Sequence, residues 1–304
     1  MKRHPMQRNT LDTTVPGSAF LNTDSETGRH IIDTMIEERC PSFVEHWSWP
    51  AVRPLLYAAL KYKTARNLAD IVQDFDGRTS FDYLADQLAV NLNLYGQERV
   101  PRTGRVIITA NHPTGLADGI AVWDAVRQIR RDVVFMANAD AIRVNPDFTD
   151  IIIPVEWVQE KRTPQKTRET LTRTKQALSE GKCVIIFPSG RLAKRIEGKL
   201  TEQEWMSSAV SLARKYDTPI QPLNVSAENS KLFYLLSAIN GQLRDITLFN
   251  ELLNKKNSRF GLNFGPLIDP NSLIGDANAV TVALRDYVST DLGQQPDEAF
   301  EREQ

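Results

Sequence analysis

Residues 106–126 read VIITANHPTGLADGIAVWDAV, and this stretch decides the fold. Val106–Ala110 is a short run of apolar and β-branched residues, which predicts a buried strand. Pro113-Thr114-Gly115 has the composition of a turn, because proline and glycine interrupt regular structure. An amphipathic segment at 119–130 then predicts a helix. The stretch is therefore typical of a strand–turn–helix unit in an α/β sheet.

The chain downstream repeats this alternation of short apolar runs with segments of helical period. Upstream, the pattern is helical and is interrupted by prolines. We therefore expect an α/β fold, with a mixed sheet covered by helices and an N-terminal helical region. The expected strands are Val106–Ala110, Val133–Ala137, Ile151–Val155, Val184–Phe187, Ile220–Val225 and Phe260–Phe264, and the expected helices are 119–130, 165–180, 202–216 and 230–253.

The same patterns divide the chain into four segments. We expect a loose N-terminal segment at 1–26, a helical region at 27–93, the α/β domain at 94–292 and a loose, polar tail at 293–304. The prediction rests on composition, because the first residues and the tail lack the apolar periodicity of the rest.

The composition excludes several classes of protein. The chain has 304 residues with 37 Lys and Arg against 38 Asp and Glu, so a net charge of −1 offers no general basic surface for nucleic acid. Two cysteines cannot form a disulfide scaffold. The N-terminus lacks a signal peptide's apolar core, and no run of about 18 apolar residues follows. We therefore expect a cytoplasmic protein whose contact with a membrane is peripheral.

The segment Trp47–Arg66 carries an apolar stripe flanked by aromatic and basic side chains. Helices that lie in a membrane interface have this pattern. A helix that packs on the α/β domain and leaves its basic residues in water has it as well, so both interpretations stay open. The stripe consists of Ala51, Val52, Leu55, Leu56, Ala59 and Leu60.

His112 directly follows the first predicted strand, and Asp118 stands near the start of the following helix. In α/β sheets, functional residues gather where strands end. A compact turn would bring the Asp118 carboxylate to the imidazole, fix its tautomer and leave the other ring nitrogen to take a proton from a hydroxyl group. The alternative is that Asp118 only caps the helix and His112 is an ordinary loop residue.

A second polar cluster follows the strand at Val184–Phe187, at Pro188-Ser189-Gly190-Arg191. Small residues and cations after a strand predict an anion site built from backbone N–H groups and side chains. A serine hydrolase is excluded, since the first glycine of G-x-S-x-G is missing and no histidine follows His112. The cations Lys194, Arg195 and Lys199 also fit a solvated helix face.

Two further strand ends contribute candidates. Arg143 places another cation after a predicted strand. Pro222 lies in the strand Ile220–Val225 and would shape a wall of the site, although a proline there also fits an edge strand.

Taken together, these motifs resemble the glycerolipid acyltransferases of the lysophosphatidic acid acyltransferase superfamily, and most of all the hemolysin-like or ornithine-lipid acyltransferase branch. The resemblance covers roughly Leu94 to Ile268. It implies that His112 deprotonates an acceptor hydroxyl, that Asp118 orients His112, and that Gly190 and Arg191 hold a phosphate or other polar headgroup. The motifs that carry it are Asn111-His112-Pro113-x-Gly115-x-x-Asp118-Gly119, Phe187-Pro188-Ser189-Gly190-Arg191, Ile220-x-Pro222-Leu223, Asn229–Tyr234 and Asn263–Ile268.

The chain departs from the superfamily pattern at two points. Five residues separate His112 from Asp118 where the commonest pattern has four, and Ser189 stands where a glutamate is common. Both departures bear on the choice of acceptor headgroup. The predicted substrate-binding residues are Asn111, Gly115, Arg143, Ser189, Gly190, Arg191 and Pro222.

We expect an O-acyltransferase that moves a fatty acyl group from acyl-CoA or acyl-carrier protein to the hydroxyl of a lysophospholipid or glycerol-phosphate-type acceptor. The reaction needs a base and oxyanion donors but no metal and no other cofactor. A water-insoluble acceptor favours a peripheral position on the inner face of the cytoplasmic membrane. Two alternatives remain, namely acylation of a lyso-ornithine-type amino-acid lipid, and a non-catalytic membrane lipid-binding protein.

Overall fold

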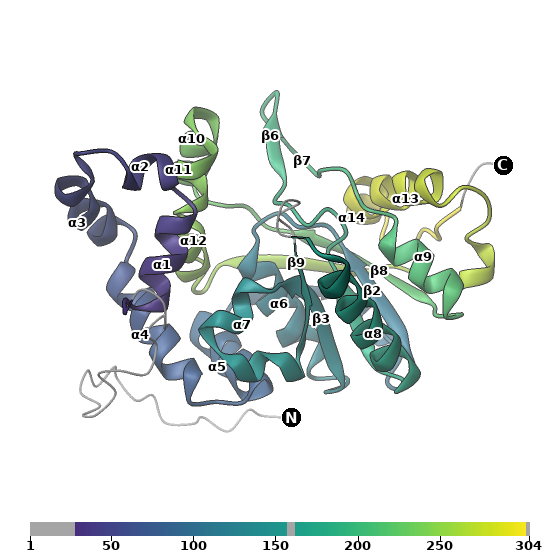
Figure 1. Cartoon of the computed structure of the whole chain (residues 1–304). Helices are drawn as coiled ribbons and strands as arrows, with labels where there is room; N and C mark the ends of the chain where they lie inside the picture. The colour runs from purple at the N-terminus through teal and green to yellow at the C-terminus, as the bar shows by residue number, and fades with distance from the viewer. Residues whose placement is uncertain (1–27, 157–161, 302–304) are drawn as a thin grey trace, which may run out of the picture.

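Seven strands form one mixed sheet in the computed structural model, which describes residues 28–156 and 162–301 (Figure 1). The strand order is β1-β9-β8-β2-β5-β3-β4. The strands from β8 to β4 run parallel to one another, whereas β9 pairs antiparallel with β8, and β1 pairs parallel with β9. The predicted α/β class with a mixed sheet is confirmed. The strands are Asn91–Tyr95 (β1), Val106–Ala110 (β2), Val133–Asn138 (β3), Ile152–Val155 (β4), Cys183–Ile186 (β5), Ile220–Ser226 (β8) and Arg259–Phe264 (β9).

Helices cover both faces of this sheet (Figure 1). Val106, Ile108 and Ala110 of β2 point into the core under α5, α6 and α12, and Ile107 points into the core under α8, α9 and α13. All of β2 is buried, as a central strand covered on both faces should be. The helices are Gly77–Leu88 (α5), Leu116–Val126 (α6), Leu248–Asn254 (α12), Pro164–Ser179 (α8), Ser208–Lys215 (α9) and Ala277–Asp286 (α13).

The N-terminal helices form a third cluster beside the sheet, seen at the left of Figure 1. Their apolar side chains pack against Ile246 and its neighbours, more than 170 residues later in the chain. The predicted helical region therefore exists, and it also contains α5. The helices of this cluster are Ile31–Glu38 (α1), Pro41–Val44 (α2), Trp49–Ala59 (α3), Tyr62–Gln73 (α4) and Gly241–Asp245 (α11).

One strand of the sheet was not predicted, and two predicted helices differ from the structure. The strand that was not predicted is β1, an edge strand with a half-exposed pattern. The predicted helix 230–253 is three helices, since Asn240 adopts an extended conformation and its side chain caps α11. The predicted helix 202–216 begins only at Ser208.

The cations after Arg191 lie on a hairpin and not on a helix face. Lys194–Ile196 (β6) and Lys199–Thr201 (β7) pair antiparallel, and Gly198 has a φ of 81° in the turn between them. The hairpin projects from the top of the molecule in Figure 1. Its turn allows Glu202 and the residues after it to fold back toward the sheet.

Part of the predicted tail at 293–304 contacts the α/β domain. Arg99 donates to the Pro296 carbonyl at 2.7 Å, and Phe300 packs against the ring of Tyr287 at 5.5 Å between centroids. The predicted loose segment 1–26 lies outside the described residues. Within the described ranges, no helix has the length and apolar composition needed to cross a bilayer.

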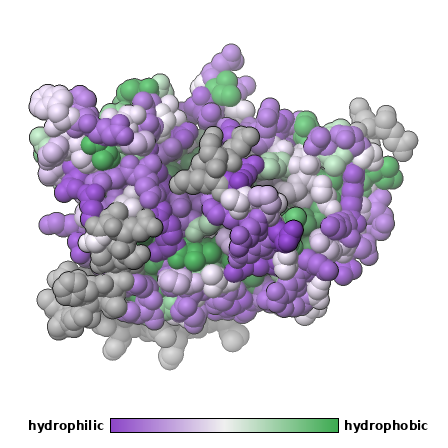
Figure 2. Space-filling model, in the orientation of Figure 1, coloured by the Kyte–Doolittle hydropathy of each residue, from purple (hydrophilic) through white to green (hydrophobic). Residues whose placement is uncertain are grey.

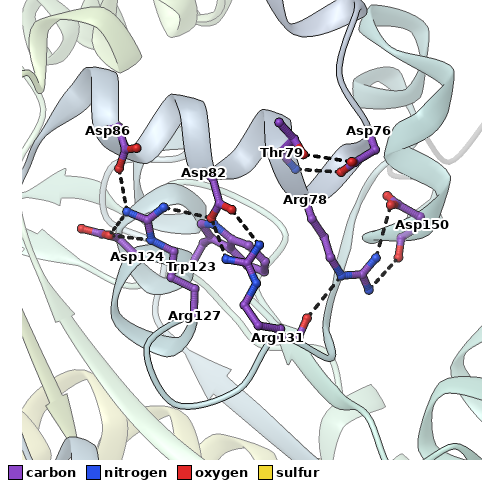
Figure 3. A network of polar contacts seen from close by, with 10 residues as sticks. All are labelled: Asp76, Arg78, Thr79, Asp82, Asp86, Trp123, Asp124, Arg127, Arg131 and Asp150. Carbon is purple, nitrogen blue, oxygen red and sulfur yellow. Dashed lines mark hydrogen bonds and ion pairs between the residues drawn. The ribbon is translucent and has the colours of Figure 1, made fainter. Parts of the chain in front are cut away.

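A polar network joins α5 to the C-terminal end of α6 (Figure 3). The carboxylate of Asp82 accepts hydrogen bonds from the indole of Trp123 at 3.0 Å, from Arg127 at 2.9 Å and from Arg131 at 2.7 Å. Partial burial opposes ionisation, but the two guanidinium groups outweigh it and hold the pKa of Asp82 below its ordinary value. The network thus anchors α6 at one end, while the other end carries Asp118.

Candidate active site

The carboxyl ends of β2, β5 and β8 lie at one edge of the sheet, because these strands are parallel neighbours. The loop after β2 carries His112, and the loop after β5 carries Ser189 to Arg191. The two loops are joined directly, since the Ala193 N–H donates to the His112 carbonyl at 3.0 Å. Residues separated by about 80 positions in the sequence therefore form one site.

Asp118 is completely buried in the first turn of α6. Its Oδ2 accepts the backbone N–H groups of Thr114 at 2.8 Å and Gly115 at 2.9 Å, and its Oδ1 accepts the Thr114 hydroxyl. The turn requires glycine at 115, because φ is 89° and a Cβ there would lie 2.8 Å from a methyl carbon of Leu192. The carboxylate thus fixes the conformation of the whole turn.

His112 lies against this carboxylate. Its Nδ1 is 3.0 Å from Asp118 Oδ2, and its ring stacks on Phe187 with 4.4 Å between centroids. Nδ1 and Oδ2 are close enough for an ion pair, but the orientation of the ring does not give a well-formed hydrogen bond between them. Active-site hydrogen bonds often align only when substrate is bound. Asp118 both caps the turn and contacts the imidazole, so the two sequence-based interpretations describe the same carboxylate.

A second carboxylate, Glu202, approaches the backbone of His112. Its Oε2 accepts the His112 N–H at 3.1 Å. Glu202 was not among the predicted site residues, because it is the first residue of the predicted helix 202–216 and no local sequence pattern marks it. Its position depends on the β6–β7 hairpin, which returns the chain to the site.

A polar cavity of about 480 Å³ opens beside the His112 loop. Asn111 and Pro113, which flank His112, contribute to its wall, whereas His112 itself does not. Arg259 contributes to the wall of the cavity and forms no ion pair within 28–156 and 162–301. The remaining lining residues are Ala193, Leu200, Glu202, Asn224, Val225, Ser226, Ala227, Glu228 and Ser289.

The predicted anion loop has its small residues where a cradle needs them. Gly190 has a φ of 56°, and the Ser189 hydroxyl donates to the Arg191 carbonyl at 2.9 Å. The Arg191 side chain is exposed and makes no ion pair with any described residue. Arg195 is not available in the same way, because it pairs with Glu228 at 2.7 Å and stacks on Tyr234.

Three predicted substrate-binding residues have other contacts. Asn111 borders the cavity, but its side-chain amide bonds both the N–H and the C=O of Val225, which ties β2 to β8. Arg143 pairs with Glu38 at 2.7 Å from α7 (Asp140–Val144), and so joins α7 to α1. Pro222 is buried in a central strand opposite Thr109, so it neither lines the cavity nor marks an edge.

Comparison with known proteins identifies the domain around this site. A family model described as Acyltransferase matches residues 91–226. A lyso-glycine lipid O-acyltransferase of Phocaeicola vulgatus is 22% identical over 204 residues, which is 64% of this chain and 71% of the relative. A second lyso-glycine lipid O-acyltransferase, from Bacteroides thetaiotaomicron, is 20% identical over 185 residues, 59% of this chain and 66% of the relative.

A solved structure also aligns with the chain. It is the crystal structure of the 1-acyl-sn-glycerophosphate acyltransferase of Thermotoga maritima, at 14% identity and a TM-score of 0.46, covering 88% of this chain and 96% of that one. The matched segment 91–226 contains β2, the His112 loop, α6, β5 and the Arg191 loop. The family model and the two curated relatives show that the segment carrying this site is similar to acyltransferases that act on lyso-lipids, and they support an acyltransferase as the activity of this chain.

Proposed function

We propose that the protein transfers a fatty acyl group from acyl-CoA or acyl-carrier protein to the hydroxyl of a lysophospholipid or glycerol-phosphate-type acceptor. His112 is the general base, and Asp118 orients it. The observation that carries this proposal is the 3.0 Å approach of His112 Nδ1 to the buried Asp118 carboxylate inside an acyltransferase domain. A protein that only binds lipid has no need of a base, so the His112–Asp118 pair favours an enzyme.

His112 and Asp118 are sufficient for the proton transfers of the proposed reaction. Nε2 of His112 takes the proton of the acceptor hydroxyl while that oxygen attacks the thioester carbonyl carbon. The tetrahedral intermediate then collapses, the C–S bond breaks, and the imidazolium returns its proton to the departing thiolate. Asp118 lies at Nδ1, where a buried carboxylate stabilises the positive charge that the ring gains during the attack.

The relatives favour a second acceptor class. Both are lyso-glycine lipid O-acyltransferases, so the acceptor in their names is a lyso-glycine lipid. An exposed Arg191 and a cavity with Arg259 suit any oxyanion headgroup, carboxylate or phosphate. We therefore retain a lyso-amino-acid lipid, for example of the lyso-ornithine type, as the alternative acceptor.

We also propose a peripheral position on the inner face of the cytoplasmic membrane. In the segment Trp47–Arg66, Trp49 and Leu60 pack inward, but Trp47 is 86% and Leu55 75% exposed. The helix α10 (Lys231–Ile239) leaves a second apolar stripe open, at Leu232, Leu235 and Ile239. Figure 2 shows hydrophobic atoms over α10 and on the projecting hairpin below its hydrophilic tip, and Figure 1 places α3, α10 and the hairpin in the upper part of the molecule.

Replacing the proposed base gives the first test. His112→Ala should lower the rate of acyl transfer about 10²–10⁴-fold, the usual contribution of a general base. The melting temperature should stay the same, because the side chain lies in a loop. Turnover of labelled palmitoyl-CoA and palmitoyl-acyl-carrier protein is measured with 1-acyl-glycerol 3-phosphate, lyso-glycine lipid and lyso-ornithine lipid. His46→Ala, an exposed histidine in the N-terminal region, is the matched control. More than a tenth of the wild-type rate in His112→Ala would remove the general-base role.

The anion loop is tested by separating the two substrates. Arg191→Ala should raise the acceptor KM about 10- to 100-fold and leave the donor KM nearly unchanged, because a hydrogen-bonded charge is worth about 1.5–3 kcal/mol. Arg191→Lys keeps the charge without the guanidinium fork and should recover only part of the loss. Arg102→Ala, another exposed arginine, serves as control. A shift in the donor KM instead would assign Arg191 to the phosphates of the thioester carrier.

Membrane contact is tested by flotation with anionic vesicles. Apolar burial contributes about 25 cal/mol per Å², and each basic residue near an anionic surface about 1 kcal/mol, so binding should be reversible and should weaken in high salt. Leu55→Glu and the double variant Lys61→Glu, Lys63→Glu should both reduce flotation. Leu171→Glu, on α8 and 53% exposed, should not. Wild-type flotation of both folded variants would place the membrane face elsewhere.

A further inference from the structure

Glu202 is held beside His112 by two hydrogen-bond donors. Oε2 accepts the His112 N–H at 3.1 Å, and Oε1 accepts the Trp205 indole N–H at 3.1 Å. The Ser189 side chain also influences the carboxyl group. Glu202 therefore joins the segment after β7 to the loop after β2, and it lies near the loop after β5.

A carboxylate at the position of Glu202 has a desolvation cost that a purely structural role would not require. Burial raises the pKa of its carboxyl group, and the hydrogen bonds from His112 and Trp205 oppose this rise without cancelling it. Among the described residues, no lysine or arginine pairs with Glu202. An apolar side chain would fill the same space without the desolvation cost. A titratable residue that does contact it is His112, through its backbone N–H.

The His112 backbone is fixed on both sides. Glu202 accepts its N–H, and its carbonyl accepts the Ala193 N–H at 3.0 Å. Phe187 supports one face of the ring, and Asp118 lies at Nδ1. With the main chain fixed in this way, rotation about the side-chain bonds is the main freedom left to the imidazole.

We propose that Glu202 is a positioning residue for His112: its carboxylate holds the His112 main chain and so sets where the imidazole lies against Asp118. The inference rests on the proposed function of His112. Glu202 reaches the loop after β2 because the β6–β7 hairpin returns the chain to the site.

Two kinds of variant test this inference in the full-length protein, with the substrate panel described above. Glu202→Gln keeps the size of the side chain but turns one acceptor oxygen into a donor, which opposes either the His112 N–H or the Trp205 N–H. We expect kcat to fall about 10- to 100-fold, the usual effect of losing a group that orients a functional side chain. KM for both substrates and the melting temperature should change little. Glu204→Gln, exposed and two residues away, should behave as wild type.

A second variant removes the carboxylate altogether. Glu202→Ser should also be slow, because the His112 and Trp205 N–H groups both lose their acceptor. A kcat of Glu202→Gln within twofold of wild type, or a raised acceptor KM at unchanged kcat, overturns the positioning role.

The same experiments separate this inference from the proposed function. If His112→Ala stays active, the general-base mechanism is wrong, and the positioning role of Glu202 is wrong as well. If His112→Ala is inactive while both Glu202 variants are fully active, only the role of Glu202 fails.

Discussion

The buried carboxylate of Asp118 is the constraint on which the site depends. A fully buried carboxylate must be surrounded by donors, and here the donors are the N–H groups of Thr114 and Gly115 and the Thr114 hydroxyl. These donors converge only if the turn takes the conformation that glycine at 115 permits. The same turn sets the start of α6 and brings His112 to 3.0 Å from the carboxylate. The start of α6, the turn before it and the His112 imidazole therefore all depend on the Asp118 carboxylate and form one structural unit.

The rest of the molecule supports this unit from three directions. Asp82 and its arginine partners anchor the far end of α6 to α5. The side chain of Asn111 ties the end of β2 to β8 by two hydrogen bonds. The loop after β5 covers the site, and Phe187, Ala193 and Glu202 reach His112 from that side. The exposed Arg191 and the cavity with Arg259 remain open to a headgroup.

The parts that sequence predicts well are those set by local patterns. The strand at Val106–Ala110 has the same bounds in the structure, and the compact turn brings His112 and Asp118 together as the short spacing suggests. Contacts between distant segments have no such local signal. Arg143 follows a predicted strand, as an anion-binding residue would, but in the structure it forms an ion pair with Glu38. From sequence, Pro222 is compatible with an edge strand. In the structure β8 lies between β2 and β9, so the strand of Pro222 is central. Glu202 depends on a hairpin of six paired residues that no apolar pattern marks.

Whether Asp118 acts through His112 is the question on which the proposed chemistry turns, and a double-mutant cycle answers it most directly. Acyl-transfer rates are compared for wild type, Asp118→Asn, His112→Ala and the combination, with melting temperatures as a check on folding. If Asp118 works only by orienting and stabilising the imidazole, the double variant is no slower than His112→Ala alone, because effects of groups that act as a unit do not add. Losses that multiply in the double variant would contradict this, and would show that the two residues contribute separately.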